Sequence, residues 1–174
     1  MMKTVAQPAE IMQKSLHQLL IDVPTQQLYY LQQGKCYKTY PISTAINGVG
    51  ERKGSNQTPR GWHIIRAKIG KARPVNTIFV GRRPLEEMYS ASMEEKYPDK
   101  DWILTRILWL SGLEPGKNRL GECDTMQRYI YIHGCPDSKP MGIPLSHGCI
   151  RMRNTDIVEL FELVPPGTTV FIRG

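Results

Sequence analysis

The sequence predicts a mainly β domain of packed mixed sheets with one or two short helices. The 174 residues include 15 Gly and 13 Pro, a content that favours many turns and short strands over a helical bundle. About seven segments have the length and composition of strands, whereas only two have apolar residues at helical spacing. The length fits one domain with its own core.

The first segment has the spacing of a helix. Ile11, Leu16, Leu19 and Leu20 fit a short amphipathic helix over residues 8–21. We therefore expect residues 1–24 to form an N-terminal helical extension and residues 25–174 to form the main domain.

A hairpin is expected next, with strands over residues 28–32 and 36–43 joined at Gly34 and Lys35. Both strands are rich in β-formers, above all Tyr. Residues 47–61 contain four Gly together with Asn and Pro, and they are predicted to be a loop.

The middle of the chain alternates between apolar and polar segments. Residues 62–68 and 77–81 have the length of strands. Residues 85–100 are polar and have little periodicity, which indicates a surface excursion and a candidate lid. Residues 102–110 fit either a helix or a buried strand by pattern alone.

Residues 128–133 alternate in polarity and predict a strand. Tyr131 and His133 share one face, and Ile130 and Ile132 share the other. A helix with Asn154 as its N-cap and a last strand over residues 169–173 follow. The apolar positions of this helix are Ile157, Leu160, Phe161 and Val164, and its end is marked by Pro165, Pro166 and Gly167.

Composition excludes several classes of protein. No apolar stretch approaches the roughly 20 residues that cross a bilayer, so we expect no membrane insertion. The N-terminus has no recognisable secretory signal, which favours a cytoplasmic protein whose four cysteines stay reduced. The net charge of +7 indicates an anionic partner.

The chemistry is concentrated in the segment from Ser146 to Arg151, which reads Ser-His-Gly-Cys-Ile-Arg. A thiol needs a neighbouring base or positive charge to become a thiolate. His133 is the candidate base for Cys149. Gly148 permits a positive φ just before the nucleophile, which would leave the amides of Gly148 and Cys149 free to stabilise an oxyanion.

This motif, together with His133 and Gly134 at the end of an apolar run, resembles the signature of the L,D-transpeptidase (YkuD-type) catalytic domain. The hairpin segment and the Thr-Pro-Arg-Gly turn at residues 58–61 also resemble that family. The resemblance covers residues 25–174 and implies that residues 102–110 form a strand. Two departures are a slightly short segment of twelve residues, 134–145, and Cys135, where the family commonly has Thr or Ser.

The resemblance implies acyl transfer on peptidoglycan tetrapeptide stems. Cys149 would attack the carbonyl at the L-centre of the diamino acid, expel the terminal D-Ala and form a thioester. A cytoplasmic location favours water as the acceptor, as in short members of the family that act as L,D-carboxypeptidases in muropeptide recycling. The alternative is a periplasmic transpeptidase that cross-links stem peptides.

The resemblance also assigns roles to the site residues. His133 is the base, and the carbonyl of Gly134 orients its ring, whereas His147 and Gly148 shape the oxyanion turn. Arg151 and Ser146 are expected at the substrate, although a structural ion pair and local turn bonds are their respective alternatives. We expect a muropeptide or tetrapeptide substrate and inhibition by carbapenems, with no cofactor, metal or nucleic acid.

Two alternatives of other classes remain open at the level of sequence. His133, Cys135, His147 and Cys149 form two His-Gly-Cys triplets that could ligate zinc in a structural module, although the spacing is tighter than in zinc knuckles. A wall-binding domain with an inactive site would have the same fold. If Cys149 is the nucleophile, the other three cysteines, Cys36, Cys123 and Cys135, are expected to be structural.

Overall fold

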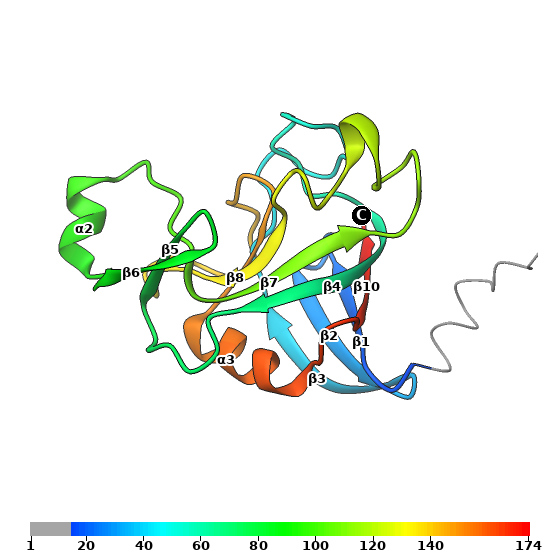
Figure 1. Cartoon of the computed structure of the whole chain (residues 1–174), viewed down its shortest axis with the longest axis horizontal. Coiled ribbons are helices and arrows are strands. Elements are labelled where there is room, and N and C mark those ends of the chain that lie inside the picture. The colour runs from blue at the N-terminus through cyan, green and yellow to red at the C-terminus, as the bar shows by residue number, and fades with distance from the viewer. Residues whose placement is uncertain (1–14) are drawn as a thin grey trace, which may run out of the picture.

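The computed structural model describes residues 15–174, and these form a mainly β domain (Figure 1). Two α-helices, α2 (Ala91–Lys96) and α3 (Asn154–Leu163), and the 3-10 turn η1 (Gly121–Cys123) accompany the strands. The ten strands are β1 (Gln18–Asp22), β2 (Gln27–Gln32), β3 (Lys35–Pro41), β4 (Gly61–Ile69), β5 (Thr77–Val80), β6 (Arg83–Met88), β7 (Leu104–Gly112), β8 (Tyr131–Gly134), β9 (Ile150–Met152) and β10 (Thr169–Arg173).

The strands form one mixed sheet that branches at β7. Its order is β3-β2-β1-β10-β4-β7-β5-β6, and β8 pairs with β7 and then with β9. The β1/β10 and β8/β9 pairs are parallel, and the other pairs are antiparallel. The predicted mainly β class, the hairpin and the strand that contains residues 104–110 are confirmed.

The main core lies between the sheet and α3, which packs on β7 and β8 (Figure 1). Ile157, Leu160 and Phe161 are buried at helical spacing, as predicted. Ile130 and Ile132 join this core, whereas Tyr131 belongs to a second cluster. The expected alternation is therefore confirmed around β8, which fixes the face on which His133 lies.

The prediction of a helix over residues 8–21 is wrong for the part that the structure describes, residues 15–21. Residues 18–22 form β1, which lies between β2 and β10, so the sheet includes residues that we placed in an N-terminal extension. Leu19 and Ile21 alternate on a two-sided buried strand. Pairing on both edges outweighs the weak helical spacing. Residues 1–14 lie outside the described part.

Two boundaries also differ from expectation. The strand predicted over residues 128–133 begins at Tyr131, because Tyr129 has a φ of 56° and lies in a turn. Asn154 is not the N-cap of α3, since Arg153 occupies that position and no side chain caps the helix. The surface excursion at residues 85–100 contains most of β6 and all of α2 at one end of the molecule (Figure 1).

No helix within residues 15–174 is long and apolar enough to span a membrane.

Candidate active site

The turn that carries Cys149 is fixed by short hydrogen bonds. Ser146 Oγ donates to the Cys149 carbonyl at 2.6 Å and accepts from the Gly148 amide at 3.2 Å. Gly148 has a φ of 132°, so the predicted positive φ is confirmed, and its carbonyl accepts from Thr58 Oγ1 at 3.0 Å. The expectation of a free Gly148 amide is wrong, because Ser146 Oγ occupies it.

The Cys149 thiol lies beside the backbone that enters β8. Its Sγ accepts a hydrogen bond from the Tyr131 amide at 3.3 Å and donates to the Tyr129 carbonyl at 3.4 Å. The half-buried side chain packs against the cluster formed by Phe79, Ile107 and Tyr131. Burial raises the pKa of Cys149 to about 12, so the resting thiol is protonated at neutral pH and needs a base.

His133 is a fully buried histidine in β8. Its Nδ1 lies 2.6 Å from the Gly134 carbonyl, which can only accept, so Nδ1 carries the proton. Nε2 is then the lone-pair nitrogen, and no residue of the described chain binds it. Burial lowers the pKa of His133, which keeps the ring neutral near pH 7. The predicted orienting role of Gly134 matches this geometry.

His133 lies in β8, and Cys149 immediately precedes the neighbouring strand β9. β8 and β9 are parallel, with His133 opposite Arg151. The described structure has no hydrogen bond between His133 Nε2 and Cys149 Sγ, because the thiol donates to Tyr129. Proton transfer therefore needs the thiol to leave the Tyr129 carbonyl.

Asp101, which was not predicted from the sequence, lies between Arg151 and His147 and interacts with both. Its carboxylate accepts from Arg151 Nη2 at 2.7 Å and lies 3.6 Å from His147 Nδ1. Burial opposes ionisation of Asp101, but His133, Arg151 and His147 more than offset it, so its pKa lies below the usual value. Only its place just before the predicted buried strand marked it in the sequence.

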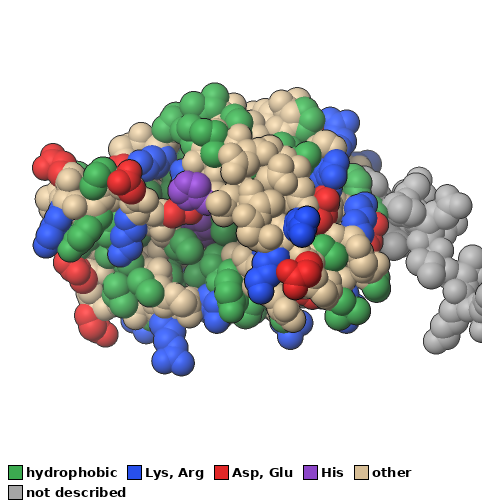
Figure 2. Space-filling view, turned by 90° about the horizontal axis from the view of Figure 1, so that it is seen from above, with side chains coloured by type: hydrophobic (Ala, Val, Ile, Leu, Met, Phe, Trp, Pro, Cys, Tyr) green, Lys and Arg blue, Asp and Glu red, His purple; other side chains and the backbone are tan. Residues whose placement is uncertain are grey.

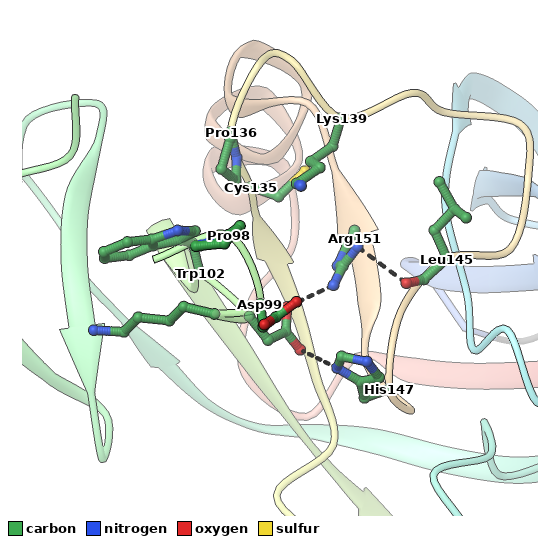
Figure 3. Close-up of a pocket in the computed structure, with 11 residues that line it drawn as sticks. Pro98, Asp99, Trp102, Cys135, Pro136, Lys139, Leu145, His147 and Arg151 are labelled. Atoms are coloured by element: carbon green, nitrogen blue, oxygen red, sulfur yellow. Dashed lines mark hydrogen bonds and ion pairs between the residues drawn. The ribbon is translucent and has the colours of Figure 1, made fainter. Parts of the chain in front are cut away.

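Arg151 and His147 border a cavity of about 350 Å³ (Figure 3). Arg151 is almost wholly buried and also donates to the Leu145 carbonyl, whereas the His147 side chain is 57% exposed. Figure 2 shows a histidine in a hollow near the middle of one face, beside charged side chains. The charged residues that line the cavity are Asp99, Lys100, Asp101, Lys139 and Arg151.

A second hollow of about 280 Å³ shares His147 with this cavity. It is lined by Lys53, Arg128 and Tyr129, and no Asp or Glu lines it. The Cys149 thiol donates to the carbonyl of Tyr129, which lines this smaller hollow, but Cys149 itself is not one of its lining residues. Cys135, not Cys149, lines the larger one.

The candidate lid is tied to the segment between β8 and the Cys149 turn. Glu94 of α2 accepts from Tyr89 and Ser138 hydroxyls, each at 2.8 Å, and forms an ion pair with Lys139. These hydrogen bonds, that of Lys139 above all, lower the pKa of Glu94 to about 2. The excursion therefore contacts the cavity wall, and its movement as a lid stays a prediction.

The zinc alternative finds no site in the described residues. No group of three or more His, Cys, Asp or Glu side chains within residues 15–174 is arranged to hold a metal ion. Cys135 is buried, and its Sγ donates to the Met152 carbonyl at 3.5 Å, while Cys149 Sγ points to Tyr129. Burial raises the pKa of Cys135 to about 12, consistent with its expected structural role.

Comparisons with known proteins show which proteins this chain is similar to. The chain is 49% identical over 156 residues to the "Probable L,D-transpeptidase ErfK/SrfK" of Salmonella typhimurium, which covers 88% of this chain and 43% of that protein. It is 27% identical over 155 residues to the "Probable L,D-transpeptidase YcfS" of Escherichia coli, with the same two coverages. The chain thus spans less than half the length of these curated relatives.

Solved structures share the fold at low identity. L,D-transpeptidase 3 from Mycobacterium tuberculosis with a faropenem-derived adduct superposes with a TM-score of 0.57 at 16% identity, over 91% of this chain and 60% of that one. LdtMt1 in complex with imipenem gives 0.55 at 17% identity, over 91% and 59%.

The sequence itself matches the model of the YkuD family, described as the L,D-transpeptidase catalytic domain, over residues 17–172. This match spans β1 to β9 and all of β10 except Arg173, and it includes His133 and Cys149. The chain belongs to the L,D-transpeptidase (YkuD) catalytic domain family.

Proposed function

We propose that the protein is a cysteine acyltransferase that acts on peptidoglycan tetrapeptide stems through Cys149. The observation that carries the proposal is the neutral His133, whose Nδ1 is held by Gly134 and whose Nε2 has no partner in the described chain. A buried, oriented and unoccupied base beside the strand that follows a cysteine is what thiol activation requires.

In the proposed reaction the thiol turns from the Tyr129 carbonyl and gives its proton to His133 Nε2. Sγ then bonds to the carbonyl carbon at the L-centre of the diamino acid. The carbon–nitrogen bond to D-Ala breaks, and the leaving amine takes the proton from His133. A thioester on Cys149 and free D-Ala result.

Backbone amides are the proposed oxyanion donors. The Gly148 amide is held by Ser146, so we assign this role to the Cys149 amide and to the Tyr131 amide, which already points at Sγ from 3.3 Å.

The charge of the two hollows supports a stem-peptide donor. In the larger cavity Arg151 and Lys139 are paired with Asp101 and Glu94, whereas Lys100 takes part in no ion pair found among the described residues; the smaller hollow is lined by two cations and no acid. A tetrapeptide stem carries carboxylates on its D-Glu, diamino acid and D-Ala residues. Arg151 lines the larger cavity, but both of its terminal nitrogens are already bound, Nη2 to Asp101 and Nη1 to the Leu145 carbonyl, so its contribution to a substrate carboxylate is its charge.

The same charges support water as the acceptor, and hence an L,D-carboxypeptidase. In a cross-linking reaction the acceptor is the side-chain amine of a second stem, which is cationic before it reacts. A hollow lined by Lys53 and Arg128 disfavours that cation but not water. The short 134–145 segment also leaves little chain to build an acceptor groove. Transpeptidation is the second candidate, favoured by the names of the relatives.

One incubation tests both the reaction and its acceptor. Purified protein is mixed with a disaccharide tetrapeptide, and the products are weighed by mass spectrometry. Disaccharide tripeptide and free D-Ala in equal amounts are expected. Cross-linked dimers as the main product at low-millimolar substrate would favour the transpeptidase, and unchanged substrate would overturn the proposed function.

A further inference from the structure

Arg82 lies at the tip of the turn between β5 and β6, and it does not line the cavity of Arg151. Val80 pairs with Arg83, so Gly81 and Arg82 alone link the two strands. Their φ angles are 54° and 64°, which are both in the left-handed region. Arginine rarely adopts this conformation, and such strain persists mainly where the surroundings hold it and where ligands bind.

The Arg82 guanidinium is held in place by three aromatic side chains. Its central carbon lies 4.5 Å from the Trp109 ring centre and 4.9 Å from that of Tyr129. Nη1 donates to the Tyr131 hydroxyl at 3.0 Å. These contacts orient the group without neutralising it, and none of the ion pairs found among residues 15–174 includes Arg82.

The same two tyrosines hold the nucleophile. Their backbone supplies both hydrogen bonds of Cys149 Sγ, from the Tyr131 amide and to the Tyr129 carbonyl. Trp109 is the cross-strand neighbour of Tyr131 in the β7/β8 pair, and Phe79 of β5 packs in the cluster that Cys149 contacts. The β5–β6 turn therefore places an uncompensated guanidinium next to the residues that surround the thiol.

We propose that Arg82 binds a carboxylate of the stem peptide at a subsite separate from the Arg151 cavity. The inference rests on the proposed function and adds a specificity-determining residue to it. A planar guanidinium held over aromatic rings is already oriented for a carboxylate, so little side-chain entropy is lost when the ligand binds. Two separate cationic subsites would favour a substrate with several carboxylates over a neutral peptide.

The test measures D-Ala release from the tetrapeptide and from derivatives with a single carboxylate converted to its amide, at D-Glu, at the diamino acid or at D-Ala. The enzymes are wild type, Arg82→Gln and Arg83→Gln. Arg83, the exposed first residue of β6, is the neighbour of Arg82 and serves as the matched control. For D-Ala the derivative releases D-alaninamide.

We expect one amide to raise the KM of wild type about 10- to 100-fold, the range of a charge-assisted hydrogen bond. Arg82→Gln should raise the KM for the parent peptide by a similar factor. For this variant, the amide that raises the KM of wild type should cause no further increase. The other two amides should change the KM of wild type and of Arg82→Gln by the same factor. Arg83→Gln should behave as wild type with all four peptides. A packing defect would not remove the discrimination against a single amide.

The outcomes separate the two proposals. No release from the parent peptide by wild type would overturn the proposed function. Release by wild type, with Arg82→Gln retaining wild-type discrimination against all three amides, would overturn the role of Arg82 alone. A thermal unfolding curve checks that the variant is folded, and Arg82→Lys, which keeps the charge, should restore part of the discrimination.

Discussion

Asp101 Oδ1 accepts a hydrogen bond from Arg151 Nη2 at 2.7 Å, and this ion pair connects the end of the surface excursion with β9. Arg151 lies two residues after Cys149 and opposite His133 in the β8/β9 pair. A single carboxylate therefore contacts the arginine and the exposed His147 and acts electrostatically on the base. Arg151, which was expected at the substrate, is thus held by a structural ion pair and lines the larger cavity while almost wholly buried.

Asp101→Asn should move the acidic limb of the kcat/KM profile to lower pH. Burial lowers the pKa of His133 and Arg151 lowers it further, while Asp101 and the Gly134 carbonyl raise it. Removal of the Asp101 charge lowers this pKa again, so the base stays neutral to a lower pH. The measurement is D-Ala release between about pH 4 and 9.

Asp99→Asn is the matched control, because Asp99 lines the same cavity and takes part in no ion pair found among the described residues. Its profile should overlay that of wild type. An Asp101→Asn profile with an unmoved or raised acidic limb would contradict the electrostatic role.

Cys149→Ala should abolish D-Ala release, by at least about 10³-fold, because the covalent step has no substitute nucleophile. Cys135→Ser should keep most activity, since a hydroxyl can donate to the Met152 carbonyl as the thiol does. Release of D-Ala is followed with a coupled oxidase assay. Activity that survives in Cys149→Ala, or disappears in Cys135→Ser, would contradict the assignment of the nucleophile.

If the proposed function holds, a carbapenem should acylate Cys149, because its strained acyl group resembles the amide that the thiolate attacks. The His133→Ala variant should react at least about 10²-fold more slowly, because burial keeps the thiol protonated and the variant lacks the proposed base. Intact-protein mass against time gives both rates. Cys149→Ala should gain no mass, and equal rates in wild type and His133→Ala would show that His133 does not activate the thiol.

The sequence predicted elements whose signal is local. The Gly34 turn, the alternation at Tyr131 and Ile132, and the helical spacing of Ile157, Leu160 and Phe161 depend on neighbours along the chain, and the structure confirms them. Cys149 and His133 carried a motif, so the core of the candidate site was also predictable.

What the sequence missed depends on partners distant in the chain. Asp101 is polar and unremarkable until β7 and β9 bring it to Arg151, 50 residues away. Residues 18–22 were predicted to be helical from their local apolar spacing. They form β1 because they pair with β10, the last strand, and this pairing cannot be read from neighbours along the chain. The Gly148 amide was expected to be free because the pattern did not show that Ser146 Oγ would bind it. Arg82 carries no motif at all.

Asn154 was expected to cap α3, but its side chain instead forms hydrogen bonds with residues of other elements. Its buried Oδ1 accepts from Thr105 Oγ1 at 2.5 Å, and its Nδ2 donates to the Cys135 carbonyl at 3.0 Å. These bonds join α3 to β7 and to the segment that follows His133.

Asn154→Ala should lower the free energy of unfolding by about 2–4 kcal/mol, since it leaves the buried Cys135 carbonyl without its amide donor and takes the acceptor from Thr105. Asn47→Ala, at an exposed loop position, should change stability by no more than about 0.5 kcal/mol. Urea unfolding followed by tryptophan fluorescence measures both. Because Cys135 lies two residues after His133, Asn154→Ala should also reduce kcat in native buffer. A loss of stability as small as that of Asn47→Ala would mean that solvent replaces these bonds and that Asn154 does not position the base.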